Sequence, residues 1–308
     1  MTYIFSFVFI SMLRIIKPCN IRTTYVITSG LSSVVRKNKV YDISLSQGLF
    51  SMVGNTEIKT EHKLQLYAHI VKKQPSTKMF ELGNMCPTYA LPMGEDVVTL
   101  YNQCIAHNKE NNINDIDIYV NSTTKEHVKR ALDNNMKNIN FLLSTSVSFQ
   151  TMNYYTDIED VENTIEWTNR LDTPIKNGRI HVDCLIECPM EGTIDMKHII
   201  ETLGRYLIDF PQYTISLENS RQQITPRGFY SIIAKLCHYV GHDITDRLAI
   251  KFSMPLRDKE IQKETKRFIE EYPNIQLHVS IINSRYNVSS IDNESHRYIL
   301  TYQALTDL

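Results

Sequence analysis

The chain lacks the features that mark several large classes of protein. Its 308 residues carry a formal net charge of −1 and no block of like charges, whereas binding to nucleic-acid phosphates needs clustered Lys and Arg. Its opening apolar run, from Tyr3 to Leu13, is too short to span a bilayer and has no basic residues before it, unlike a secretory signal. We therefore expect a globular protein with no nucleic acid and no membrane as its partner.

Cysteine is also scarce. The six cysteines have neither the spacing of a zinc finger nor the density of a small disulfide-linked domain. The closest pair, Cys184 and Cys188, lies at the end of an expected strand and in the turn after it, and we assign this pair a structural role. Such usage is typical of a reducing compartment, so the cytoplasm is the expected location.

Acidic residues are absent from the start of the chain, where the first acid is Asp42. A basic, acid-free segment is typical of an organellar transit peptide, which makes a mitochondrial location the alternative. A segment that packs under the first strand explains the composition equally well. We divide the chain into residues 1–38, a leader or barrel-bottom segment, and residues 39–308, one barrel domain.

The rest of the chain alternates short β-branched or aromatic runs with helical patterns, and the last helix is expected at Glu294–Leu305. Eight such units predict an α/β fold of the (β/α)8 type, the TIM barrel, whose usual size is about 250 residues. A doubly wound open sheet is the second choice, but no G-x-G-x-x-G turn follows the first strand. The eight expected strands are Val40–Leu45, Lys78–Leu82, Asp115–Asn121, Asn138–Ser144, Arg179–Ile186, Tyr213–Leu217, Leu248–Ser253 and Ile275–Ile281.

The carboxyl ends of these strands are polar, and active sites of such barrels are built there. On the seventh strand, Lys251 and Ser253 are two residues apart, so a cation and a hydroxyl are expected on one face. Loops are polar in any protein, so the polar strand ends alone explain only part of the case for a ligand site.

One segment carries a resemblance to a known family. The run His181–Gly192 reads H-V-D-C-L-I-E-C-P-M-E-G and resembles the fifth strand and the C-x-x-x-C-P-x-E-G turn of hydroxymethylglutaryl-CoA lyase (HMG-CoA lyase). The resemblance covers about Val40 to Leu305 and implies a metal-dependent carbon–carbon lyase barrel. Weaker matches follow in the same order at Gly48-Leu49, Phe80-Glu81, Pro92-Met93-Gly94, Ile215-Ser216-Leu217 and Thr225-Pro226.

The chain departs from that family where the chemistry is expected. The resemblance implies an arginine and a metal-binding aspartate after strand one, where this chain has Ser46 and Gln47. It implies two metal-binding histidines on strand seven, where this chain has Lys251 and Ser253. The family's acidic position after strand six corresponds to Asn219, and its glycine-rich loop with a catalytic cysteine is replaced by residues 282–287, which contain neither residue type.

These departures predict that the inherited site holds no metal, because a divalent cation such as Mg²⁺ or Mn²⁺ needs several anionic or nitrogen donors. We therefore expect no cofactor and favour a barrel that has lost lyase activity and binds a small acyl-CoA or keto acid. A homodimer of such a barrel is compatible with the sequence. The candidate substrate-binding residues are Ser46, Gln47, Asn121, Asn219 and Ser253.

Two residues remain candidates for catalysis, Lys251 and Glu81. An amine in a barrel mouth can form a Schiff base with a carbonyl substrate, which would make the chain a divergent metal-independent lyase. Alternatively, the Lys251 ammonium replaces the charge of the lost metal by pairing with Glu81 or Glu218. A residual metal-dependent lyase is the third hypothesis.

Overall fold

The structure is a computed structural model, and it describes most of the barrel domain. The described residues are 39–49, 58–85, 96–171, 175–219, 224–252 and 259–280, with the short strands at 285–286 and 297–298. Within these ranges no helix has the length and apolar character needed to cross a membrane. The predicted leader at residues 1–38 and the predicted substrate-binding residue Ser253 lie outside the described residues.

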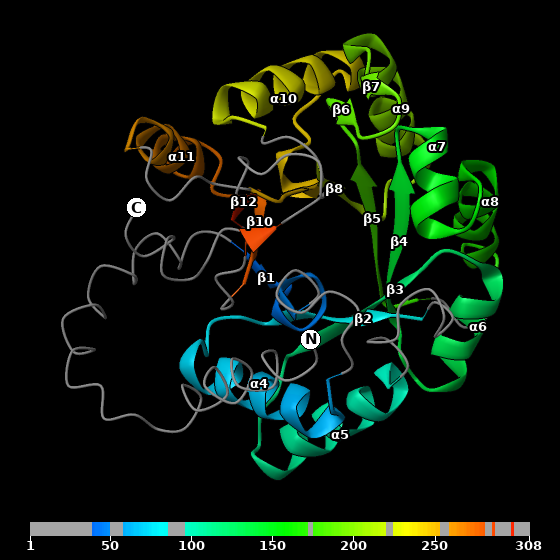
Figure 1. Cartoon of the computed structure of the whole chain (residues 1–308), viewed down its shortest axis with the longest axis vertical. Coiled ribbons are helices and arrows are strands. Elements are labelled where there is room, and N and C mark those ends of the chain that lie inside the picture. The colour runs from blue at the N-terminus through cyan, green and yellow to red at the C-terminus, as the bar shows by residue number, and fades with distance from the viewer. Residues whose placement is uncertain are drawn as a thin grey trace, which may run out of the picture.

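Eight parallel strands close into a barrel, as predicted (Figure 1). Their order around the barrel is β1-β10-β9-β8-β5-β4-β3-β2, so β10 closes the sheet by pairing with β1. All eight sequence-predicted strands are therefore confirmed, although every strand except β4 differs from its prediction at one or both ends. The strands are β1 (Val40–Asp42), β2 (Met79–Asn84), β3 (Asp117–Ser122), β4 (Asn138–Ser144), β5 (Asn177–Asp183), β8 (Thr214–Leu217), β9 (Leu248–Ile250) and β10 (Gln276–Val279).

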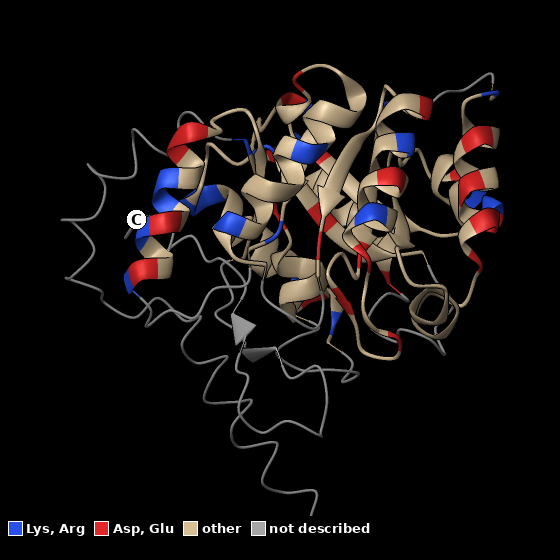
Figure 2. Ribbon diagram, turned by 90° about the horizontal axis from the view of Figure 1, so that it is seen from above, with Lys and Arg blue, Asp and Glu red and all other residues tan. Residues whose placement is uncertain are grey.

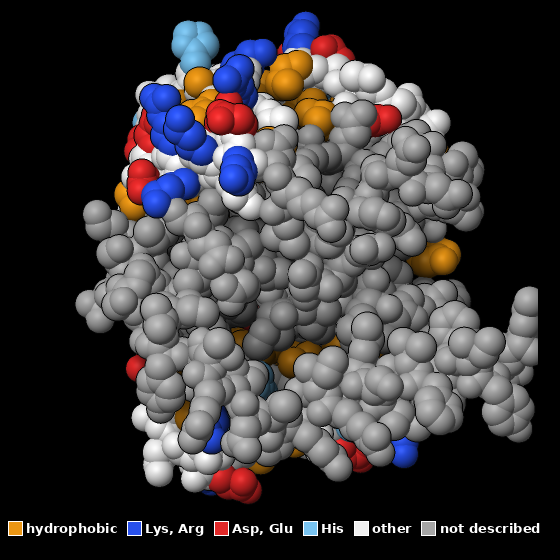
Figure 3. Space-filling model, turned by 60° about the vertical axis from the view of Figure 1, so that its left-hand side comes forward, with side chains coloured by type: hydrophobic (Ala, Val, Ile, Leu, Met, Phe, Trp, Pro, Cys, Tyr) orange, Lys and Arg blue, Asp and Glu red, His pale blue; other side chains and the backbone are white. Residues whose placement is uncertain are grey.

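Helices surround the barrel, and both basic and acidic positions are spread along them (Figure 2). On the face seen in Figure 3, described Lys and Arg side chains lie beside Asp and Glu, so the charge there is mixed. The α-helices are α4 (Thr60–Lys73), α5 (Val97–Glu110), α6 (Lys125–Asp133), α7 (Val147–Phe149), α8 (Ile158–Thr168), α9 (Met196–Asp209), α10 (Pro226–Val240) and α11 (Lys259–Glu271). The π-helical turns η1 (Ser44–Gly48) and η3 (Gln150–Tyr154) and the 3₁₀ turn η4 (Thr245–Arg247) complete the described helical elements.

The main hydrophobic core lies between the strands and these helices. In α4, Tyr67, Ile70 and Val71 are buried, which is the spacing of one helix face. The Tyr67 ring packs edge-on against Phe80 of β2, with centroids 5.2 Å apart. Burial of such side chains contributes about 1.5–3 kcal/mol each and holds the barrel together.

Strands β1, β5 and β9 each end three residues earlier than their apolar runs predict. After β1, the Asp42 carboxylate accepts hydrogen bonds from the Ser44 backbone N–H (2.9 Å) and hydroxyl (3.0 Å), which turns the chain into η1. After β5, Cys184 adopts a left-handed φ of 58° that ends the strand. The β9 strand ends at Ile250, so Lys251 lies directly after it.

The C-x-x-x-C turn is a small hairpin of β6 (Glu187–Cys188) and β7 (Gly192–Thr193). Cys184 and Cys188 are both buried free thiols. The Ser146 hydroxyl lies 3.0 Å from Cys188 Sγ, which joins this turn to the loop after β4.

The predicted helix at Glu294–Leu305 is wrong in part. Residues Arg297–Tyr298 form strand β12, which pairs antiparallel with β11 (Arg285–Tyr286). The remainder of that predicted helix lies outside the described residues.

Candidate functional site

The barrel interior is lined mainly by polar side chains, whereas the apolar side chains of the main hydrophobic core lie on the outer side of the strands. On β5, Ile180 and Val182 belong to the main hydrophobic core, whereas Arg179, His181 and Asp183 alternate with them. Arg179 reaches across the barrel to β10, where it donates a hydrogen bond of 2.6 Å to the Gln276 side chain. The interior of this barrel is therefore a hydrogen-bonded network.

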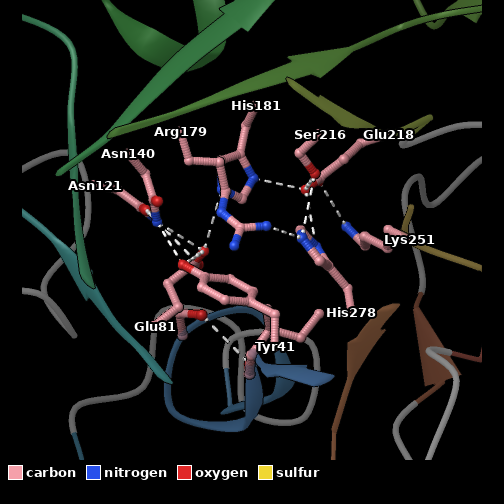
Figure 4. A network of polar contacts seen from close by, with 12 residues as sticks. Tyr41, Glu81, Asn121, Asn140, Arg179, His181, Ser216, Glu218, Lys251 and His278 are labelled. Atoms are coloured by element: carbon pink, nitrogen blue, oxygen red, sulfur yellow. Dashed lines mark hydrogen bonds and ion pairs between the residues drawn. The ribbon is translucent and has the colours of Figure 1, made fainter. Parts of the chain in front are cut away.

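The network is shown in Figure 4. Its members lie on, or directly after, the eight barrel strands, and they contact one another across the barrel. The labelled residues are Tyr41, Glu81, Asn121, Asn140, Arg179, His181, Ser216, Glu218, Lys251 and His278.

Lys251 forms an ion pair with Glu218 at the carboxyl ends of β9 and β8. Lys251 Nζ lies 3.3 Å from Glu218 Oε2, and the side chains are only 8% and 6% exposed. Burial alone raises the pKa of Glu218, but the charges of Lys251 and His181 outweigh it, and the hydrogen bond from His181 adds to them. The pKa therefore lies well below its usual value, and Glu218 is ionised.

His181 joins this ion pair to a second carboxylate. Its Nδ1 lies 2.7 Å from Glu218 Oε1. Because an ionised carboxylate only accepts hydrogen bonds, His181 Nδ1 is the donor. Its Nε2 lies 3.7 Å from Glu81 Oε2 and has no hydrogen-bond partner among the described residues. Glu81, His181, Glu218 and Lys251 thus form a series of ionisable groups.

His278 approaches the same carboxylate from β10. Its Nε2 lies 3.1 Å from Arg179 Nη1, and a guanidinium can only donate. His278 Nε2 must therefore accept, which leaves the proton of the neutral ring on Nδ1. That Nδ1 lies 3.4 Å from Glu218 Oε1 but makes no hydrogen bond with a described residue. Burial lowers the pKa of His278 to about 3, so the ring is neutral near pH 7.

Arg179 has contacts of its own that fix its position. It is 1% exposed, and its guanidinium carbon lies 3.8 Å from the centre of the Tyr41 ring. With the hydrogen bond to Gln276, this stacking fixes the side chain that determines the His278 tautomer.

The residues around Glu218 allow a test of whether the donor set fits a metal. His181, Glu218 and His278 offer ligand atoms within 4.8 Å of one another, and imidazole with carboxylate suits several divalent metals. However, the two nitrogens that face Glu218 both carry protons, and a metal needs their lone pairs. The Lys251 ammonium also lies on the other carboxylate oxygen. In this arrangement the three side chains do not fit a divalent cation.

Glu81, the other predicted partner of Lys251, is bound by different residues. Its carboxylate is fully buried and accepts hydrogen bonds from Asn121 (3.1 Å), Asn140 (3.2 Å) and the Tyr41 hydroxyl (3.3 Å). Burial, with the Glu81 charge next in effect, raises the pKa of Tyr41 well above its usual value. Of the two partners predicted for Lys251, the structure places Glu218 beside it.

The other predicted binding residues are placed as follows. Asn121 belongs to the network, whereas Ser46 and Gln47 lie in η1 after β1. The Ser46 hydroxyl donates to the Ile43 carbonyl at 3.3 Å, and Gln47 Oε1 is buried without a hydrogen-bond partner among the described residues. Asn219 Oδ1 accepts from the backbone N–H groups of residues 186 and 187, so it holds the turn after β5.

Sequence reasoning assigned no role to His181, His278, Arg179 or Asn140. The signal was present as a period of two, since polar residues alternate with apolar ones along β5 and β10. A barrel strand is buried on both faces, and here the polar face is the interior.

Comparisons with known proteins agree with the fold. No family model matches the sequence, and no curated protein matches it either. Among solved structures, HMG-CoA lyase from Brucella melitensis superposes with a TM-score of 0.68 at 14% identity, covering 88% of this chain and 89% of that one. An HMG-CoA lyase from Acinetobacter baumannii, solved with coenzyme A and 3-methylmalate, gives 0.68 at 15% identity, covering 88% and 82%. The chain therefore has the fold of the HMG-CoA lyases.

Proposed function

We propose that this barrel has lost the metal-dependent carbon–carbon lyase reaction and binds a small acyl-CoA or keto-acid ligand at its mouth. The main support for this proposal is that both carboxylate oxygens of Glu218 already have partners. One oxygen faces the Lys251 ammonium and the other accepts from His181. The charge that would attract a divalent metal is already neutralised by protein cations and hydrogen-bond donors.

Loss of the metal would remove the main source of catalysis. Cleavage of this type develops an enolate, which a metal or an arginine stabilises. Removing one such donor typically costs about a hundredfold to a thousandfold in rate. Ser46 and Gln47, which occupy the positions aligned with the family's arginine and aspartate, supply neither charge.

A divergent enzyme that uses Lys251 as an amine is the second hypothesis. A Schiff base requires the neutral amine, and a carboxylate 3.3 Å away favours the ammonium. The ion pair therefore supports a role for Lys251 as a fixed positive charge.

The ligand class is inferred from the fold. The Acinetobacter baumannii enzyme was solved with coenzyme A and 3-methylmalate, and active sites of (β/α)8 barrels lie at the carboxyl ends of their strands. We place the ligand of this chain at the same end, where Lys251 follows β9.

The test combines metal content, turnover and binding. The full chain is purified without chelators, its Mg, Mn and Zn are measured by mass spectrometry, and HMG-CoA cleavage is assayed with each metal added. We expect neither bound metal nor turnover, while coenzyme A or a short hydroxy acid binds in a calorimetric titration. Stoichiometric metal together with turnover would contradict the proposal.

Borohydride trapping with a keto acid separates the second hypothesis. We expect no covalent adduct in the native chain or in a Lys251→Ala variant. An adduct that forms in the native chain and disappears in Lys251→Ala would instead identify a Schiff-base enzyme.

A further inference from the structure

Three potential metal ligands converge inside the barrel from three separate strand positions. His181 comes from β5, His278 from β10, and Glu218 follows β8. All three are buried, and their ligand atoms lie within 4.8 Å of one another. Two histidines and one carboxylate form a ligand set that binds Zn²⁺ in many proteins. Two protein cations, Arg179 and Lys251, lie directly against this set.

We propose that His181, Glu218 and His278 form a latent transition-metal site that Arg179 and Lys251 hold closed. The inference rests on the proposed function, because it explains how the mouth stays free of metal. We further infer that the site would accept Zn²⁺ or Co²⁺ once Arg179 and Lys251 are replaced by uncharged side chains.

Arg179 closes the site by fixing a tautomer. Its Nη1 donates to His278 Nε2 at 3.1 Å, so the His278 proton resides on Nδ1, the atom that faces Glu218. A metal-binding histidine has the opposite arrangement, in which the distal nitrogen donates its proton to an acceptor. Arg179 cannot serve as that acceptor, and its contacts with Tyr41 and Gln276 keep it in place.

Lys251 closes the site by charge. Its ammonium lies 3.3 Å from Glu218 Oε2, so a cation on Oε1 would be within a few ångströms of a second positive charge. Both side chains are almost fully buried, so neither solvent nor salt screens that repulsion effectively.

The test neutralises both cations and uses Co²⁺ alone as the probe. Arg179→Gln replaces the obligatory donor with a side chain whose carbonyl oxygen can accept from His278 Nε2, and Lys251→Met removes the ammonium. We compare the native chain, each single variant and the double variant by Co²⁺ absorption spectroscopy and by metal content. Each change is expected to raise Co²⁺ affinity by about tenfold or more.

Two controls make the result specific. Adding Glu218→Gln to the double variant should abolish Co²⁺ binding. A matched variant, Arg205→Met with Lys176→Met, removes two exposed ion-paired cations and should bind no Co²⁺. Circular dichroism establishes that each variant is folded, and Arg179→Met replaces Arg179→Gln should the latter fail to fold.

The outcomes distinguish this inference from the proposed function. A native chain that binds stoichiometric Co²⁺ through Glu218 would overturn both. A native chain without metal, together with a folded double variant that also binds none, would overturn only the latent site. Co²⁺ binding that survives Glu218→Gln would place the metal elsewhere and overturn the assignment as well.

Discussion

Removing the Lys251 ammonium should destabilise the barrel strongly. In a Lys251→Met variant, Glu218 stays buried but loses the cation 3.3 Å from its Oε2. Breaking a buried ion pair from one side typically costs about 3–5 kcal/mol. The His181 hydrogen bond to Oε1 remains, so we expect a loss near the lower end, about 3 kcal/mol.

Two comparisons isolate the cause of that loss. A Lys251→Met, Glu218→Gln double variant leaves no unpaired charge and should recover about half of the loss. Lys176→Met removes a shorter pair, 2.7 Å to Asp117, but Lys176 is 63% exposed, so its cost should stay below about 1 kcal/mol. Urea unfolding followed by circular dichroism measures all three variants. Equal losses in Lys251→Met and Lys176→Met would show that burial does not make the Lys251–Glu218 pair more important for stability than an exposed pair.

Three further predictions concern the scaffold. Gly178→Ala should cost about 3 kcal/mol in urea unfolding, because its Cβ would lie 1.8 Å from the buried Tyr213 ring. Gly204→Ala should be nearly neutral, since the Tyr239 ring that faces it is half-exposed. Arg247→Met should cost about 2–4 kcal/mol in the same assay, because its guanidinium donates to the backbone carbonyls of Leu207 in α9 and of Phe210 and Tyr213 before β8. Arg247→Lys should recover only part of that loss. Mainly through burial, the pKa of His127 lies below its ordinary 6.5, so the folded state binds fewer protons and loses stability below about pH 6.5. Between about pH 7.5 and about pH 5.5, the melting temperature of His127→Gln should therefore fall less than that of the native chain. An equal fall in both proteins would contradict the role of His127.

The fold was predictable because its signal is local and repeated. Eight apolar runs separated by helical patterns suffice for a barrel, and each run overlaps one of its eight strands. Strand ends were less predictable, because burial continues after pairing stops. Ile43 and Phe252 are both buried, yet each lies beyond the end of its strand.

The site was only partly predictable. Lys251 and Glu81 were found through the resemblance and their places on the strands, and Glu218 through its place at a strand end. His181 and His278 were missed because they lie inside their strands, whereas site residues were expected at the carboxyl ends of the strands. The decisive feature, the tautomer of His278, depends on Arg179, which is 99 residues away in sequence. No local pattern encodes a contact of that kind.

The position of the ring proton of His278 tests most directly whether this site excludes a metal. An NMR spectrum of the chain with ¹⁵N-labelled histidine reports which ring nitrogen carries the proton. We predict that His278 is neutral with its proton on Nδ1, and that added Zn²⁺ or Mg²⁺ leaves its signals unchanged. A proton on Nε2, or loss of the Nδ1 proton when the metal is added, would contradict a closed site, because Nδ1 would then be free to bind a metal.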